Sequence, residues 1–457
     1  MLIINGKLIT WGLDGQSSEN QIMPHGSGLL IRNGLIEKIA PQDELLRDYP
    51  DEDCLDAEGQ YVMPGNICAH THFYGAFSRG LGIPGDAPTN FTQILDKLWW
   101  NLDKALDEDG VRYSALVCLV DAVKHGTTTL IDHHASPNAI DGSLDIIAET
   151  VNQAGLRASL CYEVTDRDGA EKTEQGLQEN LRFIERVKKQ APEDANLRAH
   201  FGLHASLTLS DETLARANEL CPPGIGFHIH AAEGIADQVF SLETSGKRVA
   251  HRLDHFGILR PESILAHGVH LDESEIARLA ETQTWLTHQP RSNMNNAVGV
   301  APIEDMLEAG VRVGMGNDGF SNTMWQEWKE AYLLHKLYHR DPQRMGGYTI
   351  TKLAVDNNAA LVSGLFDGLP VGDISEGAAA DLIFVDYHPF TPLLAGNLPW
   401  HILFGFQESM ITATIVAGKP LMYRRELLTL DEAEIAAKAM EISSSIWKRF
   451  EDIATQK

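Results

Sequence analysis

The sequence predicts an α/β fold: a barrel of eight parallel strands, joined by a smaller sheet domain to which both ends of the chain contribute. The barrel is predicted by eight short apolar runs that alternate with longer helical segments between about residues 61 and 320, as in consecutive βα units. The sheet domain is predicted by strand signals that return near 371–421, in DLIFVDY and TATIVAGKPLM, after a largely helical region. Eight βα units in one chain are typical of a (β/α)8 TIM barrel.

Each part of the chain supports this division. Residues 1–60 contain short alternating apolar runs separated by Gly and Asn turns, which predicts a small antiparallel sheet. The domain boundaries that follow are 1–60 with 371–425 for the sheet domain, 61–370 for the barrel and 426–457 for a closing amphipathic helix. The predicted barrel strands are 61–70, 127–132, 156–162, 197–203, 225–230, 263–267, 284–288 and 311–317.

Composition excludes several classes of protein. No apolar run approaches the roughly 18 residues of a membrane span, and the start, MLIINGKLITWG, lacks the features of a signal peptide, so a cytoplasmic protein is expected. The formal charge of -27 disfavours binding to nucleic acid, whose phosphates need clustered Lys and Arg. The five cysteines include no Cys-x-x-Cys pair, which argues against a disulfide framework or a thiolate zinc site.

The first barrel run ends in two histidines, in the segment YVMPGNICAHTHF. Side chains two residues apart in a strand lie on one face, so His70 and His72 can bind a single metal ion through their imidazoles. Such a pair can also be two ordinary core or surface histidines. The context favours ligands, because Pro64 and Gly65 mark the entry to the strand and further candidate ligands follow later strands.

Histidines and acids recur where the other barrel strands end, which is the face that carries the active site in this architecture. Any one of them can be a structural residue, but their joint placement predicts the site of a metal-dependent hydrolase. They lie in IDHHASP, GLHASL, FHIHAAE, LAHGVH and GMGNDG, and comprise His133, His134, His204, His228, His230, Glu233, His267 and Asp318.

The motifs PGNICAHTHF, HIHAAE, ILAHG, PRSNMNN and GNDG resemble those of the amidohydrolase superfamily, in the same order and over nearly the whole chain. Within it, the chain is most similar to the mononuclear cytosine deaminase and chlorohydrolase-like (ATZ/TRZ) branch. IDHHASP, LWWNLDKALDED and TPLLAGN resemble the SsnA-type aminohydrolases. The resemblance implies a (β/α)8 barrel flanked by a composite β-sandwich from both termini.

The resemblance also implies roles for individual residues. The metal ligands would be His70, His72, His230 and Asp318, with Glu233 as a proton shuttle and His267 polarising the attacked group or the water. Asp318 would share in taking the proton from that water. Binuclear relatives use a lysine on the fourth strand, and LRAHFGLHASL contains none, so one divalent ion is expected, zinc first and iron as the alternative.

Several residues at or near predicted strand ends are candidate substrate contacts, although turn capping or packing explains the same residues equally well. The candidates are His133, His134, His204, Asn293, Arg79 and Tyr74. Aromatic residues that could stack on a flat heterocycle, or equally pack in the core, are Tyr74, Phe77, Trp99, Trp100 and Trp325.

The predicted reaction is hydrolytic deamination of an amino-substituted purine, pyrimidine or related heterocycle by a metal-activated hydroxide. Hydrolysis of a cyclic amide, or displacement of another leaving group such as chloride, uses the same nucleophile and stays open. A non-catalytic metal-binding accessory protein is a further alternative. The partner is expected to be a small molecule, with no nucleic acid or membrane, and the protein a homo-oligomer, a dimer or larger.

Overall fold

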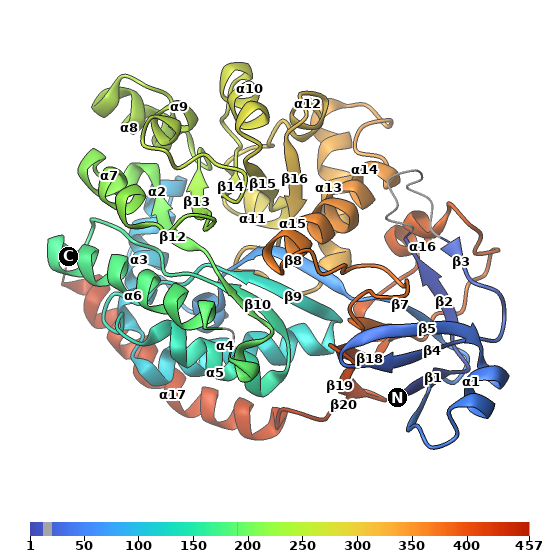
Figure 1. Ribbon diagram of the computed structural model, residues 1–457. Helices are drawn as coiled ribbons and strands as arrows, with labels where there is room; N and C mark the ends of the chain where they lie inside the picture. Colours follow the sequence, from blue (N-terminus) through green and yellow to red (C-terminus); the bar gives the residue numbers. More distant parts are fainter. Residues whose placement is uncertain (12–20, 190, 457) are drawn as a thin grey trace.

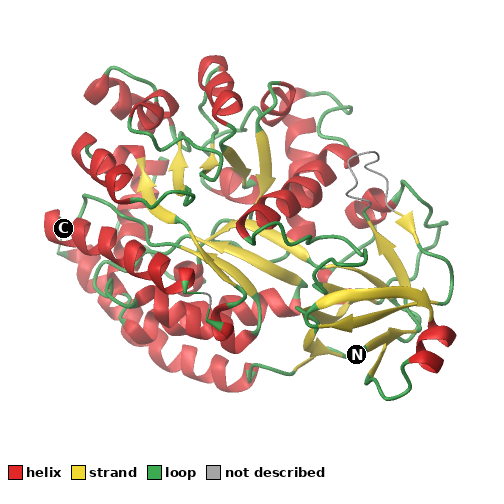
Figure 2. Ribbon diagram, viewed as in Figure 1, coloured by secondary structure: helices red, strands yellow, loops and turns green. Residues whose placement is uncertain are grey.

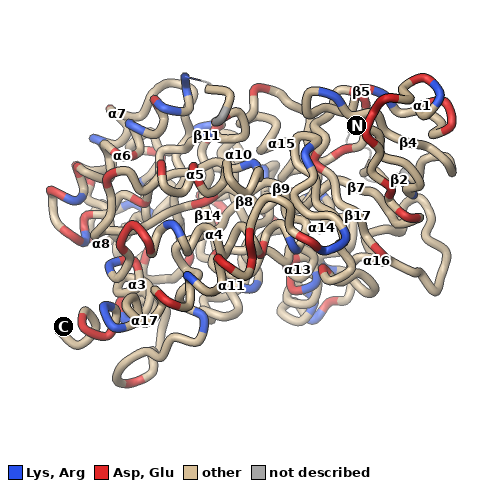
Figure 3. Tube along the Cα trace, turned by 90° about the horizontal axis from the view of Figure 1, so that it is seen from below, with Lys and Arg blue, Asp and Glu red and all other residues tan. Residues whose placement is uncertain are grey.

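The computed structural model describes residues 1–11, 21–189 and 191–456 (Figure 1). Figure 2 shows the barrel strands surrounded by helices, with a strand-rich region at one side that contains the N-terminus. In the described part of the chain, no helix combines the length and apolar character needed to cross a bilayer. Asp and Glu are dispersed over many elements and interspersed with Lys and Arg (Figure 3).

Eight parallel strands form the barrel, which confirms the predicted fold class. They are β8 (Asn66–Thr71), β9 (Thr127–Asp132), β10 (Arg157–Leu160), β12 (Phe201–Ala205), β13 (Phe227–Ala231), β14 (Ile264–His267), β15 (Trp285–His288) and β16 (Arg312–Met315), with β11 (Leu197–Ala199) just before β12. They pair in two sheets, β11-β10-β9-β8 and β12-β13-β14-β15-β16. Parallel bridges join the sheets at both seams, Thr71 with Asp318 and Val164 with Leu203.

Helices follow the strands and cover the barrel. They are α4 (Glu108–Lys124), α5 (Ser143–Ala154), α6 (Ala170–Lys188), α7 (Asp211–Leu220), α8 (Ile235–Ser245), α9 (Val249–His255), α10 (Glu273–Thr282), α11 (Pro290–Asn295), α12 (Ile303–Glu308), α13 (Met324–His339), α14 (Gly347–Thr351) and α15 (Asn358–Leu365). Local sequence fixes some of their starts. Asp272 and Glu275 form a capping box at α10, and Ser210 caps α7.

Two sheets pack against each other beside the barrel, the larger built from both ends of the chain and the smaller from the N-terminal strands. The larger has the order β20 (Glu426–Leu427), β19 (Lys419–Tyr423), β18 (Ile411–Val416), β17 (Leu382–Val385), β7 (Tyr61–Pro64), β2 (Lys7–Thr10) and β3 (Gln21–Ile22). The smaller contains β5 (Leu35–Pro41), β4 (Ser27–Arg32), β1 (Leu2–Ile4) and β6 (Cys54–Asp56), with α1 (Gln42–Asp48) following β5. Buried apolar side chains of both sheets, among them Leu29, Ile31, Val62 and Phe384, form one core.

The first predicted barrel run spans two sheets. Tyr61–Pro64 pairs with β17 and β2 in the larger terminal sheet, and the barrel strand begins only at Asn66. Gly65 separates them, and a Cβ at this position would lie 2.2 Å from Cγ2 of Thr128. Only glycine therefore lets the chain pass this close to β9 as it enters the barrel.

The remaining helices border the mouth of the barrel or close its side. After the 3-10 turn Phe73–Ser78 come α2 (Phe91–Ile94), a π-helical segment Leu95–Trp99 and α3 (Trp100–Ala105). The terminal helix α17 (Glu432–Thr455) packs on this region, where Trp447 Nε1 donates to the carbonyl of Phe77 at 2.9 Å. The short helix α16 (Leu398–Phe404) lies between β17 and β18 in the chain.

Candidate active site

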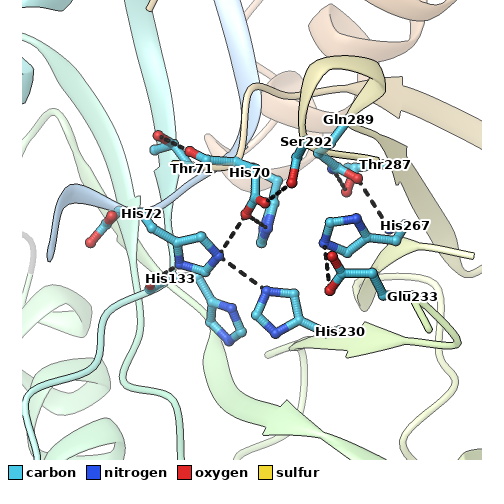
Figure 4. Close-up of polar contacts among 12 residues, drawn as sticks. His70, Thr71, His72, His133, His230, Glu233, His267, Thr287, Gln289 and Ser292 are labelled. Atoms are coloured by element: carbon cyan, nitrogen blue, oxygen red, sulfur yellow. Dashed lines mark hydrogen bonds and ion pairs between the residues drawn. The ribbon is translucent and has the colours of Figure 1, made fainter. Parts of the chain in front are cut away.

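The four candidate ligands converge from three strand ends at the mouth of the barrel. His70 is on β8, His72 directly follows it and His230 is on β13 (Figure 4). Asp318 lies just beyond β16. Nε2 of His72 is 3.1 Å from Nε2 of His230 and 2.9 Å from Oδ1 of Asp318. The same carboxylate oxygen is 3.3 Å from Nε2 of His70. Three imidazole nitrogens and one carboxylate therefore face a common point.

Hydrogen bonds on the far side of each ring fix which nitrogen faces that point. Nδ1 of His72 donates to the carbonyl of His133 at 2.6 Å, and Nδ1 of His230 donates to the carbonyl of His204 at 2.8 Å. Because a carbonyl only accepts, each Nδ1 carries a proton, and in the neutral form of each ring Nε2 carries a lone pair. Two lone pairs 3.1 Å apart repel each other unless a cation or a proton lies between them.

His70 completes the same arrangement. Its Nδ1 is 2.8 Å from Nε2 of His228, and its fully buried Nε2 makes no hydrogen bond to any described residue. A buried polar atom without a partner is costly, and a metal ion is a natural partner for this one. His70, His72, His230 and Asp318 therefore fit a divalent ion by donor type, tautomer and direction.

Two further imidazoles, those of His133 and His267, lie close enough to the cluster to be candidate ligands. Groups whose ligand atoms all lie within 4.8 Å of one another include His70, His72, His133 and His230, and also His70, His230, His267 and Asp318. Neither ring nitrogen of His133 has a hydrogen-bond partner among the described residues. His133 stacks on His228, with ring centroids 4.4 Å apart.

The electrostatics of the pocket keep His230 and Asp318 in their metal-binding forms. Burial lowers the pKa of His230 well below its usual value, so this imidazole is neutral at physiological pH. Burial alone would raise the pKa of Asp318, but His72 and His70 beside it hold that pKa well below its usual range. A neutral imidazole and an ionised carboxylate are the forms that bind a divalent cation. Burial alone would lower the pKa of His72, but Asp318 and Glu163 beside it raise that pKa well above its usual value, so His72 must release a proton when a metal ion binds.

Glu233 lies at the edge of the ligand cluster, between His267 and Asn296. One of its oxygens is 3.5 Å from Nε2 of His267, and the other accepts from Nδ2 of Asn296 at 3.2 Å. Burial raises the pKa of Glu233 to about 7, despite the opposing effect of His267. A carboxyl group with that pKa can hold a proton or release it at neutral pH, as a proton shuttle must.

His267 is oriented from behind. Its Nδ1 is 2.9 Å from Oδ1 of Asn293, and its backbone N–H donates to the side chain of Gln289. Asn293 is fully buried and does not line the pocket, so the structure places this predicted substrate contact against His267 instead. Ser292, from the same helix α11, donates to Oδ2 of Asp318 at 2.5 Å.

A pocket of about 650 Å³, measured to its open mouth, lies over the ligand cluster. One wall is apolar and comes largely from the segment 91–99, and the floor is polar. The lining residues are His72, Tyr74, Phe91, Leu95, Trp99, His204, Ala205, Leu207, His230, Glu233, Gly234, Asp237, Asn296, Asp318 and Gly319. This described lining contains three carboxylates and no Lys or Arg.

The other residues predicted from sequence divide between the pocket and its surroundings. Tyr74 and His204 line the pocket, whereas His134 is buried nearby with Nε2 2.9 Å from Oγ of Ser136. Arg79 is exposed and does not reach the pocket. Of the five aromatic candidates, Tyr74 and Trp99 line the pocket; Phe77, Trp100 and Trp325 do not.

Besides Asp237 in the pocket lining, sequence reasoning missed a buried carboxylate next to the site, Glu163. Its oxygens are 3.2 Å from Nδ1 of His72, 3.4 Å from Nδ1 of His133 and 3.7 Å from Nε2 of His204. Neither oxygen makes a well-formed hydrogen bond with a described residue. The signal was available, because Glu163 directly follows the predicted strand 156–162, where side chains reach the active-site face.

Comparisons of sequence and of structure identify known proteins that are similar to this chain. A sequence profile of the amidohydrolase family matches residues 61–421. A 5-methylthioadenosine/S-adenosylhomocysteine deaminase of Haloarcula marismortui is 31% identical over 444 residues, covering 96% of this chain and 98% of the relative. A 5'-deoxyadenosine deaminase of Methanosarcina mazei is 31% identical, covering 92% and 94%. The solved structure of an adenosine deaminase from Xanthomonas campestris with bound zinc matches with a TM-score of 0.82 at 22% identity, over 98% of both chains.

Proposed function

The chain belongs to the amidohydrolase family, and on that premise we propose that it is a metal-dependent aminohydrolase that deaminates an aminopurine compound of the adenosine type. The observation that carries the proposal is the convergence of His70, His72, His230 and Asp318 beside Glu233, whose pKa is raised to about 7. The named relatives act on adenosine-like compounds, which supports an aminopurine as the substrate.

We assign the metal ligands to His70, His72, His230 and Asp318, and expect one ion at this site, zinc before iron. The described β12 segment has no lysine to bridge a second ion there. A divalent ion held by this set would supply a hydroxide nucleophile at neutral pH. Asp318 and His267 both border the site, and we assign to them the proton that the water would lose.

Glu233 carries protons in this proposal. In its protonated form it donates to the ring nitrogen next to the attacked carbon, where negative charge develops. It then takes the proton of the hydroxyl group added at that carbon, as the carbonyl forms, and passes it to the departing amine, which leaves as ammonia. Asn296 holds the carboxyl group of Glu233 in place, and Asn293 holds His267.

The pocket lining supports an uncharged substrate. Glu233, Asp237 and Asp318 make the lining acidic, and no lining Lys or Arg can pair with a phosphate or a carboxylate. We therefore propose that a free aminopurine or its nucleoside binds better than the corresponding nucleotide. The rings of Tyr74 and Trp99 and the side chains of Phe91 and Leu95 provide an apolar wall for the base or its 5' substituent.

The test is ammonia release from zinc-loaded protein with adenosine, 5'-deoxyadenosine, methylthioadenosine, S-adenosylhomocysteine, guanine and AMP. We expect ammonia from an uncharged adenosine-type compound, a weaker response to AMP, and loss of activity in Asp318→Asn and after removal of the metal with a chelator. A ring-opened acid as the product of a cyclic amide, with no ammonia from any purine, would contradict the proposal. Turnover that survives removal of the metal would contradict the assigned ligands. Cytoplasmic location and a homo-oligomeric state stay predictions.

A further inference from the structure

A second cluster of metal-binding side chains lies outside the pocket. His335 and His339 are on α13, and Glu304 is on α12 (Figure 1). One potential ligand atom from each of the three lies within 4.8 Å of the other two. None of the three lines the pocket over the active site, so this cluster is separate from the candidate catalytic ligands.

Helix geometry explains how the two histidines meet. Residues four apart lie on one face of a helix, one turn from each other. The rings of His335 and His339 are nearly parallel, with an interplanar angle of 21° and centroids 6.2 Å apart. A pair of histidines at this spacing on a helix, with a carboxylate from a neighbouring element, is a donor set suited to zinc.

Only one of the two carboxylate oxygens of Glu304 has a hydrogen-bond partner among the described residues. Oε1 of Glu304 accepts the backbone N–H of Met345 at 2.9 Å. Oε2 is buried and has no hydrogen-bond partner in the described part of the chain; its nearest cationic group is Nη1 of Arg344, at 3.5 Å. A buried carboxylate oxygen gains a strong interaction if a cation enters.

His335 is held in the state that binds a metal. It is 1% exposed, and burial together with His339 lowers its pKa to about 4, so the ring is neutral at physiological pH. Its Nε2 is 3.3 Å from Nε2 of His288, at the end of β15, and this contact restrains the ring. Ligand histidines are typically oriented by such a contact.

We propose that Glu304, His335 and His339 bind a second divalent metal ion, zinc by their donor chemistry, which ties α12 to the end of α13. In a tetrahedral zinc site with bonds of about 2.0–2.1 Å, ligand atoms are roughly 3.4 Å apart, so shifts of about 1 Å close the cluster. His339 is exposed at the last residue of its helix and can make such a shift. Water supplies the fourth ligand.

Two cationic side chains border the second metal site and lower its affinity for a metal ion. Arg344 has 40% of its side chain exposed and can turn from Glu304 into solvent. Lys336 points its ammonium group at the backbone carbonyls of Pro342 and Arg344. Both charges oppose a second cation, and we therefore expect weaker binding here than at the four-residue active-site set.

The experiment counts zinc ions per chain by mass spectrometry after equilibration with chelator-buffered zinc. Wild-type protein should hold two, and His339→Ala and Glu304→Gln should each hold one while retaining the unmodified protein's activity. The control is His388→Ala, because His388 is 89% exposed and pairs with Asp386 at the surface. That variant should still hold two zinc ions.

Two further variants separate this site from the active site. Asp318→Asn should weaken zinc binding at the active site and leave zinc bound at the second site. Arg344→Gln should bind the second zinc a few-fold more tightly, because a like charge beside Glu304 is gone. Zinc should also raise the unfolding temperature of wild-type protein by an increment that His339→Ala loses. One zinc per chain in folded wild-type protein, or two in His339→Ala, overturns the proposal.

Discussion

Replacing Glu163 by Gln tests whether a carboxylate behind the metal site strengthens it. The carboxylate is 1% exposed and lies 3.2 Å from Nδ1 of His72, on the side of the ring opposite to Asp318. A carboxylate in this position makes a ligand imidazole a stronger donor and fixes its orientation. The substitution keeps the shape of the side chain and removes its charge.

The size of the effect follows from two opposing contributions. If His72 carried a full positive charge, it would attract the carboxylate 3.2 Å away by about 5 kcal/mol at an effective dielectric constant of about 20, which is an upper limit for a neutral ligand imidazole. Desolvation of the buried carboxylate cancels most of that attraction. Replacements behind metal ligands typically weaken metal binding 10- to 100-fold, which is roughly 1.4–2.7 kcal/mol, and we expect Glu163→Gln to fall in this range.

The assay is competition for zinc with a chromophoric chelator, run beside an unfolding curve. Glu179→Gln is the matched control, because Glu179 is also buried but accepts from the backbone of Gly142 and Leu144 and pairs with Arg182. That control should lower stability and leave zinc affinity unchanged. If folded Glu163→Gln bound zinc within about twofold of wild type, the carboxylate would have no influence on His72, and the reasoning would fail.

Three other predictions concern catalysis, acid stability and the support of the site. Glu233→Gln should lower kcat by about 10²- to 10⁴-fold with unchanged metal content, and an unaffected rate would remove its assigned role. Burial lowers the pKa of His200 to about 4, so as the pH falls the unfolded chain takes up a proton at this histidine before the folded protein does. Between pH 7 and 5 this histidine alone should lower the free energy of unfolding by about 2 kcal/mol. Urea unfolding of His200→Gln should therefore depend less on pH in this range. Arg291→Ala leaves the buried carboxylate of Glu327 without its guanidinium, 2.5 Å away, and should lower the free energy of unfolding by about 3–5 kcal/mol; a loss below about 1 kcal/mol would show that the pair contributes little to stability.

The barrel was predictable because its strands are short, apolar and separated by helical segments of the expected length. Each predicted run contains or overlaps an observed strand, and the histidines at their ends do meet. Strand alternation alone is enough to place His70 and His72 on one face. What periodicity could not show is that Tyr61–Pro64 pairs with β17, more than 300 residues later in the chain.

The pocket wall was not predictable from local pattern. Phe91 and Leu95 belong to a short helix and a π-helical segment whose apolar residues resemble any buried helix face in the sequence. They line the pocket because the segment 91–99 folds over the mouth of the barrel, and this packing depends on tertiary structure and not on local sequence. Asn293 and Asn296 show the same limit: three residues apart on one short motif, they hold two different catalytic candidates, His267 and Glu233.

The seam between β16 and β8 joins the fold to the chemistry. Asp318 has a φ of +56°, which is rare for a residue other than glycine and costs free energy. It is held there by backbone hydrogen bonds across the seam, from its own N–H to the carbonyl of His70 and from the N–H of His72 to its carbonyl. The bonds that connect the last barrel strand to the first therefore also place the carboxylate between the two imidazoles. A metal ion bound by these three residues would lie across the same seam, so metal binding and the pairing of β16 with β8 should stabilise each other.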